Sequence, residues 1–330
     1  MLKAQYTERG PVPESSIEAL SWDKPALSSG QVLIEVLAAP INPSDVLTLT
    51  GEYGMLPPLP AVGGNEGVGR VVELAEGLKG PAIGQTVLLP VGCGTWSSHV
   101  VAAAKELIPL PNDADPQQLA MMTVNPPTAS LMLSEFVDLK AGDWVIQNAA
   151  NSGVGGYLIQ LAKLRGFKTV NVVRRDSAVA AVEAEGADVV LVDGDDLRQR
   201  MLEATGGEAP RLGIDAVGGA ATDRLASCLG EGAVLVNYGA MSREPCQVAP
   251  LNLVFKDIQL KGFWLARWFQ QASPEQKMKV FGEVAALIAA GKLHARVAAT
   301  YGLSEIKQAV AAAAAGEREG KVLVVPAAGT

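Results

Sequence analysis

Residues 148–155 read NAANSGVG and stand between a short apolar strand, Trp144–Ala149, and a helix whose apolar side chains repeat at helical spacing. Gly166 ends that helix, and the chain then alternates apolar strands with helical stretches. The further strands are Thr169–Val173, Asp188–Asp193, Leu212–Val217 and Ala233–Gly239, with Ser177–Glu185 and Thr222–Leu229 as helical stretches between them. Because parallel strands need crossover connections, this alternation predicts an α/β fold with a doubly wound parallel sheet.

The turn itself has the small residues that a dinucleotide-binding loop requires. In the usual pattern three glycines allow the backbone N–H groups at the helix start to approach a pyrophosphate. Here Ala150 and Ser152 take the first two places and Gly155 keeps the third. We therefore expect cofactor contacts from Asn151, Ser152, Gly153 and Val154. A tight strand-to-helix turn without a ligand is the alternative.

The end of the second strand indicates which cofactor binds. Enzymes that use NAD place a carboxylate about 20 residues after the glycines, where it accepts a hydrogen bond from the ribose 2′-hydroxyl. Arg174 stands 19 residues after Gly155 and is followed by Arg175. A guanidinium binds a 2′-phosphate through paired, charge-assisted hydrogen bonds, so the sequence favours NADPH. Asp176 follows directly and keeps NAD open as the minor alternative, and a solvated surface pair is the other interpretation of the two arginines.

Composition excludes several classes of function. The 330 residues are 48% hydrophobic and 19% charged, with a net charge of −8. Phosphate surfaces require clustered Lys and Arg, so a protein that binds nucleic acid or an anionic membrane is not expected. No apolar run approaches the roughly 18 residues of a membrane span.

Three cysteines, Cys93, Cys228 and Cys246, are too few and too scattered for a disulfide framework or a four-Cys zinc lobe. The first residues, MLKAQYTERG, lack the apolar stretch of a secretory signal. These features lead us to expect a cytoplasmic protein, although a mature organellar enzyme would have the same composition.

The segments before and after the alternating strands and helices have other sequence patterns. Up to about residue 120, short strands (Gln31–Ala38, Gly67–Leu74 and Thr86–Pro90) are separated by Pro and Gly. Five prolines in Ala39–Pro60 predict ordered loops there. After the aromatic segment Phe263–Phe269, the chain is expected to form a helix capped by Ser273, a helix over Ser304–Ala315, and a strand, Lys321–Pro326, that returns to the N-terminal part.

This order of parts resembles the medium-chain dehydrogenase/reductase superfamily. Residues 63–69 (GGNEGVG) match the superfamily's Gly-His-Glu-x-x-Gly stretch, but Asn65 stands in place of the zinc-binding His. Asn42 likewise replaces the Cys ligand of the zinc alcohol dehydrogenases. A catalytic zinc needs three protein ligands, so no metal is expected. The resemblance implies a strand-rich GroES-like catalytic domain, residues 1–125 and 267–330, and a Rossmann NADPH-binding domain, residues 126–266.

Within that superfamily, Asn42–Val68, Asn148–Arg175 and Phe263–Trp268 resemble the mitochondrial-type 2-enoyl thioester reductases. The Tyr of that family's Gly-x-Tyr-Gly is regarded as the catalytic acid, which implies this role for Tyr53. The expected reaction is hydride transfer from NADPH to Cβ of a trans-2-enoyl thioester and protonation at Cα. Surface packing is the alternative role for a loop tyrosine.

The resemblance also implies further contacts with the cofactor. The implied residues are Asn42, Asn125, Tyr238, Gly239, Ala240, Met241, Phe263, Trp264, Leu265 and Lys321. The alternatives are core packing for the aromatic run and a surface position for Lys321. A homodimer is expected through an edge strand of the cofactor sheet, Asp257–Lys261.

Two other functions remain open on the sequence alone. One is an NADPH:quinone oxidoreductase of the same fold, which would need no phenol at Tyr53. The other is a reductase-like protein that holds NADPH without turnover. Acyl chain length, the acyl carrier (CoA or acyl carrier protein) and the arginine that holds the 2′-phosphate are not readable from the sequence.

Overall fold

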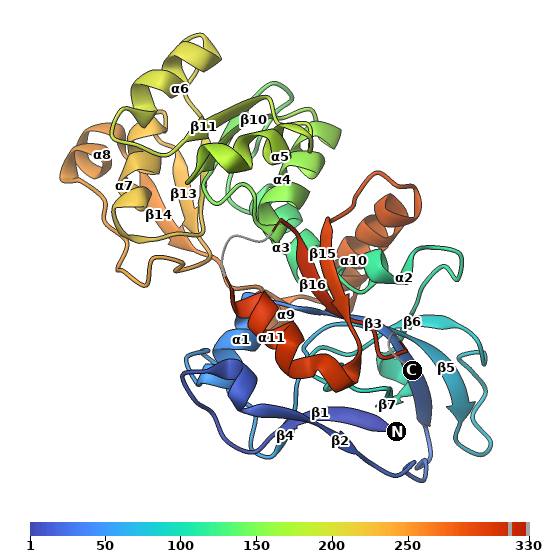
Figure 1. The fold of residues 1–330 in the computed structure, drawn as a ribbon. Coiled ribbons are helices and arrows are strands. Elements are labelled where there is room, and N and C mark those ends of the chain that lie inside the picture. Colours follow the sequence, from blue (N-terminus) through green and yellow to red (C-terminus); the bar gives the residue numbers. More distant parts are fainter. Residues whose placement is uncertain (316–318, 328–330) are drawn as a thin grey trace. The chain divides into compact units, whose positions relative to one another are not determined.

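The computed structural model describes residues 1–315 and 319–327, which form two units (Figure 1). Unit 1 comprises Met1–Val124 and Glu283–Thr330, and unit 2 comprises Asn125–Gly282. The expected division returned to the first domain at residue 267, whereas the contacts place the return at Glu283, inside helix α10 (Pro274–Ala289). Phe269 and Phe281 stack at 5.7 Å, which ties the first half of α10 to the preceding helix.

Unit 2 contains a parallel sheet in the order β11-β10-β9-β12-β13-β14. Its strands are β9 (Trp144–Gln147), β10 (Lys168–Val173), β11 (Val189–Val192), β12 (Leu212–Asp215), β13 (Val234–Asn237) and β14 (Gln259–Gly262). In chain order this is 3-2-1-4-5-6, the doubly wound arrangement with its switch point between β9 and β12. The predicted fold class is confirmed. The five strands expected from Trp144 to Gly239 are present, four of them with shorter bounds and β10 with one residue more at its start.

Helices cover both faces of this sheet. They are α3 (Asn125–Met132), α4 (Gly153–Leu164), α5 (Val179–Glu183), α6 (Leu197–Thr205), α7 (Gly219–Cys228), α8 (Pro250–Lys256) and α9 (Leu265–Gln271), with a 3-10 turn η3 (Asp176–Ala178). Ile159 of α4 and Val182 of α5 pack with Val173 on one face. Leu197 of α6 and Leu225 of α7 belong to the other core. In β10 and β11, alternate side chains therefore enter opposite cores.

Unit 1 is rich in strands. The described strands are β1 (Leu2–Tyr6), β2 (Ile17–Ser21), β3 (Gln31–Ile41), β4 (Ala61–Val62), β5 (Val68–Leu74), β6 (Thr86–Leu88), β7 (His99–Ala103), β8 (Ile108–Pro109), β15 (Val297–Tyr301) and β16 (Lys321–Val324). The shorter elements and helices are η1 (Pro13–Ser15), α1 (Pro43–Thr50), η2 (Ala104–Glu106), α2 (Pro116–Leu119), η4 (Leu303–Glu305) and α11 (Ile306–Ala314). β16 pairs antiparallel with β3, which confirms the expected return of the last strand.

The proline-rich segment Ala39–Pro60 is more regular than expected. β3 continues to Ile41, and helix α1 occupies Pro43–Thr50. Proline stabilises the first position of a helix because its missing N–H has no intrahelical partner there. The carboxylate of Asp45 accepts the backbone N–H of Asn42 at 2.7 Å and caps the helix start. The prediction of loops throughout the segment was therefore wrong for its first half.

Candidate active site

The turn after β9 is closely packed against the start of α4. Ser152 is the N-cap of α4, and its hydroxyl accepts the N–H of Gly155 at 3.1 Å. A Cβ on Gly155 would lie 2.4 Å from the carbonyl oxygen of Ala150. Gly155 therefore allows the turn to lie directly on the helix, which is the role expected of the third glycine in a dinucleotide loop.

The same turn suits a pyrophosphate. The first N–H groups of any α-helix lack intrahelical acceptors, and the helix dipole favours an anion at that end. Helix α4 begins at Gly153, which has no side chain, and Val154 follows it. The backbone N–H groups at the helix start are therefore open to a ligand. The residues present thus fit the phosphates of a dinucleotide.

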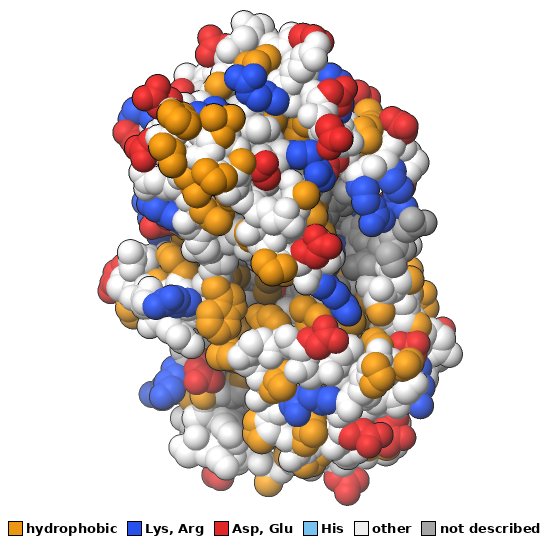
Figure 2. All heavy atoms as spheres, turned by 90° about the vertical axis from the view of Figure 1, so that its left-hand side faces the viewer, with side chains coloured by type: hydrophobic (Ala, Val, Ile, Leu, Met, Phe, Trp, Pro, Cys, Tyr) orange, Lys and Arg blue, Asp and Glu red, His pale blue; other side chains and the backbone are white. Residues whose placement is uncertain are grey.

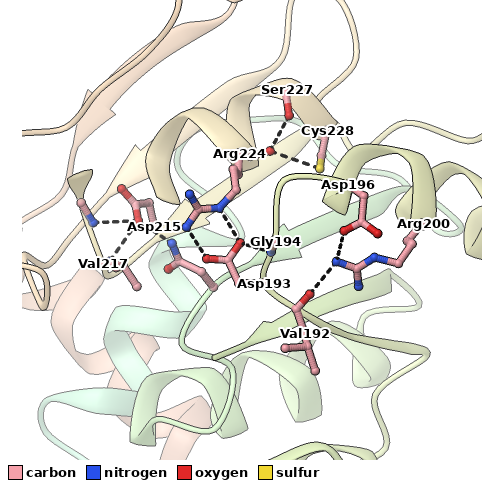
Figure 3. A network of polar contacts seen from close by, with 12 residues as sticks. Val192, Asp193, Gly194, Asp196, Arg200, Asp215, Val217, Arg224, Ser227 and Cys228 are labelled. Atoms are coloured by element: carbon pink, nitrogen blue, oxygen red, sulfur yellow. Dashed lines mark hydrogen bonds and ion pairs between the residues drawn. The ribbon is translucent and has the colours of Figure 1, made fainter. Parts of the chain in front are cut away.

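A buried polar network fixes the switch point of the sheet. Asp215, at the end of β12, is fully buried, and its Oδ1 accepts Nδ2–H of Asn148 at 2.6 Å and the N–H of Val217 at 2.9 Å (Figure 3). Its Oδ2 accepts from Thr222 at 2.7 Å and from Asn237 at 2.9 Å. This carboxylate joins the ends of β9, β12 and β13 and so holds the edge where ligands bind in such sheets.

The sequence analysis missed this network. The only signal was a charged residue, Asp215, at the end of an apolar strand. Beside it, Arg224 of α7 pairs in two places with Asp193, which follows β11, with Nε–Oδ1 at 2.7 Å and Nη2–Oδ2 at 2.5 Å (Figure 3). This bidentate ion pair fixes the loop after β11 to α7.

The two predicted phosphate-binding arginines lie at the end of β10. Arg174 is exposed and Arg175 is half-buried, and Asp176 begins the 3-10 turn that follows. Because β10 is the neighbour of β9, this end of the strand lies beside the dinucleotide turn. The structure therefore brings the arginines to the same edge of the sheet as Ser152.

The ends of β13 and β14 supply the remaining residues of unit 2. Desolvation raises the pKa of the Tyr238 phenol, whereas its hydrogen bond with the Ser152 side chain lowers it. A Cβ on Gly239 would lie 2.8 Å from the carbonyl oxygen of Ala216, so the chain after β13 also passes close to backbone. Ala240 and Met241 follow and are exposed. Tyr238 thus joins the end of β13 to the start of α4.

The side chains of the aromatic segment after β14 are not buried in a hydrophobic core. Phe263 is half-buried and meets Phe136 edge-to-face at a centroid distance of 6.0 Å, while Trp264 is 42% exposed. Leu265 opens α9, in which no residue is buried. Asn125, the first residue of α3, is buried at 7% exposure.

Unit 1 contains a second buried polar network around Glu66. One carboxylate oxygen of Glu66 accepts Nδ2–H of Asn42 at 2.7 Å, and the other accepts the N–H groups of Thr123 and Val124 at 3.0 and 2.9 Å. Glu66 is completely buried. Burial raises the pKa of its carboxyl to about 7, against the opposing effect of the nearby Lys321 ammonium.

Asp45 and Lys321 complete this network. Asp45 accepts Nδ2–H of Asn65 at 2.6 Å, and burial raises the pKa of its carboxyl to about 6. Lys321 is 5% exposed, and its ammonium donates to the amide oxygen of Asn42. Lys321 was expected to lie at the phosphate side of the cofactor or on the surface. Instead, the structure places it, with Asn42, in the interior of unit 1.

At the two positions where zinc enzymes of the superfamily have metal ligands, this chain has amides that both bind carboxylates. Asn42 binds Glu66, and Asn65 binds Asp45. Over the described ranges, no group of three or more His, Cys, Asp and Glu side chains is arranged to hold a metal ion. Lys321 supplies the positive charge nearest to the two carboxylates.

Tyr53 lies in the segment that connects α1 to β4. Gly51 ends α1 in the left-handed conformation, with φ of 84°. The N–H groups of Glu52 and Tyr53 then donate to the carbonyl of Leu47 at 2.9 and 3.2 Å. Tyr53 itself is half-buried, whereas its successors up to Pro60 are exposed. The backbone at Tyr53 is therefore held at the start of an otherwise exposed loop.

Two family models match the chain. Residues 28–112 match the alcohol dehydrogenase GroES-like domain, and residues 153–281 match the zinc-binding dehydrogenase family. The mitochondrial enoyl-[acyl-carrier-protein] reductase of Caenorhabditis elegans is 41% identical over 277 residues, which are 82% of this chain and 79% of the relative. This chain belongs to the 2-enoyl thioester reductase family of the medium-chain dehydrogenases/reductases.

Solved structures of reductases have the same fold. A chain of the Etr1p/Etr2p heterodimer, a mitochondrial 2-enoyl thioester reductase of Candida tropicalis, is 28% identical, with a TM-score of 0.86 and coverage of 98% of this chain and 99% of that one. A complex of Etr1p with NADP and crotonyl-CoA has a TM-score of 0.87 at 26% identity, with the same coverages. A putative NADPH:quinone reductase of Bacillus thuringiensis has a TM-score of 0.88 at 27% identity and covers 98% of both chains.

The relatives of this reductase overturn one expectation. A cytoplasmic location was expected, but the curated relatives are named as mitochondrial enzymes. The composition of a mature organellar enzyme does not differ from that of a cytoplasmic one, so the sequence features used could not separate them. In the described part of the chain no helix is both long and apolar enough to cross a membrane.

Proposed function

We propose that this reductase uses NADPH to saturate the Cα=Cβ bond of a trans-2-enoyl thioester, with Tyr53 as the proton donor. The observation that carries the proposal is the retention of Tyr53 at the start of the loop after α1, in a unit whose metal-ligand positions hold Asn42 and Asn65. A phenol is a proton donor that requires no metal. The complex of the related Etr1p with NADP and crotonyl-CoA supports the same substrate class.

The roles of the chain's own residues follow from this reaction. NADPH, when bound, supplies the hydride that adds to Cβ of the thioester. Tyr53 then gives its phenolic proton to Cα, so one hydride and one proton saturate the bond, and solvent returns the proton to the phenolate. The start of α4 holds the pyrophosphate through backbone N–H groups. Arg174 and Arg175, beside it at the end of β10, bind the 2′-phosphate and select NADPH over NADH.

The experiment compares three acceptors in parallel: crotonyl-CoA, a longer enoyl-CoA and a quinone. General acid catalysis typically contributes about 10²–10⁴-fold, so the Tyr53→Phe variant should lose that much kcat on the enoyl-CoA substrates. Quinone reduction should fall much less, because its protons can come from water. NADPH affinity measured by fluorescence titration serves as the control and should stay unchanged.

The second candidate function is quinone reduction, which the similarity to the putative NADPH:quinone reductase favours. Full turnover of crotonyl-CoA by Tyr53→Phe would refute the role of the phenol. If the unmodified protein also reduced the quinone far faster than any enoyl-CoA, quinone reduction would replace the proposed function.

We also propose that the protein is a homodimer formed through β14. In the described sheet β14 pairs only with β13, and all four of its residues are exposed. The neighbouring α8 exposes apolar side chains, with Val254 at 71% and Phe255 at 75%. Figure 2 shows the face on which α8 and β14 lie, and hydrophobic side chains gather in its upper part.

A second copy of the chain fits this surface. Antiparallel pairing of two β14 strands would satisfy their unpaired N–H and C=O groups and bury both apolar patches. Light scattering at micromolar concentration should therefore give the mass of a dimer, and Phe255→Asp should lower it to that of a monomer. A monomeric unmodified protein would refute this proposal.

A further inference from the structure

The segment that carries Tyr53 is held at both of its ends. Residues 51–60 connect the end of α1 to β4, and all but Gly51 and Tyr53 are exposed. At one end the N–H groups of Glu52 and Tyr53 bind the carbonyl of Leu47. At the other end β4 pairs with β1, where Tyr6 lies opposite Ala61. A contact with the exposed middle of the segment can therefore add to these two attachments.

Arg9 provides such a contact. Its guanidinium donates a hydrogen bond from Nη2 to the carbonyl oxygen of Pro57. Its aliphatic stem lies against the end of α1, since a Cβ on Gly51 would be 3.5 Å from Cδ of Arg9. The next residue, Gly10, donates its N–H to the carbonyl of Leu49 at 3.2 Å. One side chain thus touches the loop on both sides of Tyr53.

Arg9 is in turn held by the interior of unit 1. The guanidinium lies 5.8 Å from the ring centroid of Tyr6, which is only 2% exposed. Burial raises the pKa of the Tyr6 phenol, and the charge of Arg9 and its hydrogen bond with the phenol lower it. Because Tyr6 belongs to β1, Arg9 links the loop to a strand that cannot move independently of the core.

We propose that Arg9 is a positioning residue for the reduction: it holds residues 51–60 so that the Tyr53 phenol can deliver its proton to Cα. This inference rests on the proposed function, because it gives Arg9 no role except through Tyr53. A misplacement of a reacting group by about 1 Å can cost about 10²-fold in rate. Loss of the guanidinium should therefore lower kcat on crotonyl-CoA by about 10–100-fold while the KM for NADPH stays unchanged.

Three variants test the role of Arg9. Arg9→Met keeps a stem that can pack on Gly51 and Tyr6 but removes the hydrogen bond to Pro57. Arg9→Lys keeps the charge and one donor, so it should recover part of the lost kcat. Lys24→Met is the matched control, because it removes a positive charge of the same unit from an exposed ion pair with Glu73 and should leave kcat unchanged.

A double-mutant cycle with Tyr53→Phe decides whether Arg9 acts through the phenol. The Arg9→Met/Tyr53→Phe variant should be no slower than Tyr53→Phe alone. Chymotrypsin gives a second measurement that does not depend on turnover, since it should cleave after Tyr53 faster in Arg9→Met than in the unmodified protein. Circular dichroism should show that both proteins are folded.

The outcomes separate this inference from the proposed function. If Tyr53→Phe is impaired but Arg9→Met is fully active, or if the two losses multiply, the inference is wrong and the proposed function stands. If Tyr53→Phe retains full enoyl-CoA turnover, the phenol has no role as an acid, so this inference and the proton-donor part of the proposed function both fall, while enoyl reduction itself stands. Unchanged chymotryptic cleavage in Arg9→Met would also overturn the inference.

Discussion

Two adjacent glycines of α4 should respond in opposite directions to the same substitution. At Gly155 a new Cβ would lie 2.4, 2.7 and 2.9 Å from the O, C and Cα atoms of Ala150. These are backbone atoms, and Ala150 is fixed by its own N–H bond to the carbonyl of Val172 in β10. At Gly156 no atom lies within 4 Å of the added Cβ.

The expected free energies follow from these distances. Overpacking of this kind costs about 1–3 kcal/mol, and the gain in helix propensity offsets only part of it. Gly155→Ala should therefore destabilise unit 2, whereas Gly156→Ala should stabilise it by roughly 0.5–1 kcal/mol. Each kcal/mol corresponds to roughly 2–4 °C in Tm for a domain of about 150–250 residues, the size class of unit 2.

The assay is thermal unfolding of both variants and the unmodified protein, with and without NADPH. Gly155→Ala should lower Tm and weaken NADPH binding, because the turn that faces the pyrophosphate must shift. Gly156→Ala should raise Tm and leave the Kd for NADPH unchanged. Equal Tm shifts of the same sign would refute the argument, as would a Gly155→Ala protein that binds NADPH normally.

Three further predictions concern charged side chains. The Arg174→Ala/Arg175→Ala variant should raise the KM for NADPH roughly ten- to a hundredfold and barely change that for NADH; equal use of both cofactors by the unmodified protein would contradict this. Because the folded state keeps the Glu66 proton up to about pH 7 while the unfolded state releases it near its ordinary pKa, stability should fall as the pH rises between these values. Glu66→Gln should flatten that slope of Tm against pH, and an unchanged slope would refute it. Lys321→Met should cost about 3–5 kcal/mol of stability without changing the preference for NADPH, and a lost preference would instead assign Lys321 to the phosphate.

The sequence predicted the cofactor unit well because its signals are local. The strands expected from Trp144 to Gly239 are short apolar runs. In the turn after the first of them, small residues stand at the spacing that a dinucleotide-binding loop requires, from Ala150 to Gly155. The cap of α10 was also readable: Ser273 accepts the N–H of Gln276 at 3.2 Å, as the Ser-Pro pair indicated. Hydrophobic periodicity and helix capping depend on residues that are close in the chain, so both can be recognised in the sequence without knowing the tertiary fold.

The polar networks could not be predicted because their members are distant in sequence. Lys321 reaches Asn42 across almost the whole chain, and Asn148 reaches Asp215 across 67 residues. Helix α1 was missed for a different reason: the prolines of Ala39–Pro60 predicted loops, although Pro43 occupies the position where proline favours a helix. The contact of Arg9 with Pro57 has no signal in the sequence.

The network around Glu66 explains how the superfamily's zinc position can hold amides in a stable fold. A buried carboxylate that loses its cation is costly unless other donors satisfy it. Glu66 accepts from the Asn42 amide and two backbone N–H groups, and Asp45 accepts from the Asn42 N–H and the Asn65 amide. Lys321 then satisfies the remaining oxygen of Asn42 and brings a positive charge next to both carboxylates. The amides and Lys321 thus satisfy both carboxylates with groups of the chain itself. In the mechanism proposed above the proton comes from the Tyr53 phenol, so the loop that holds Tyr53 matters as much as the cofactor sheet.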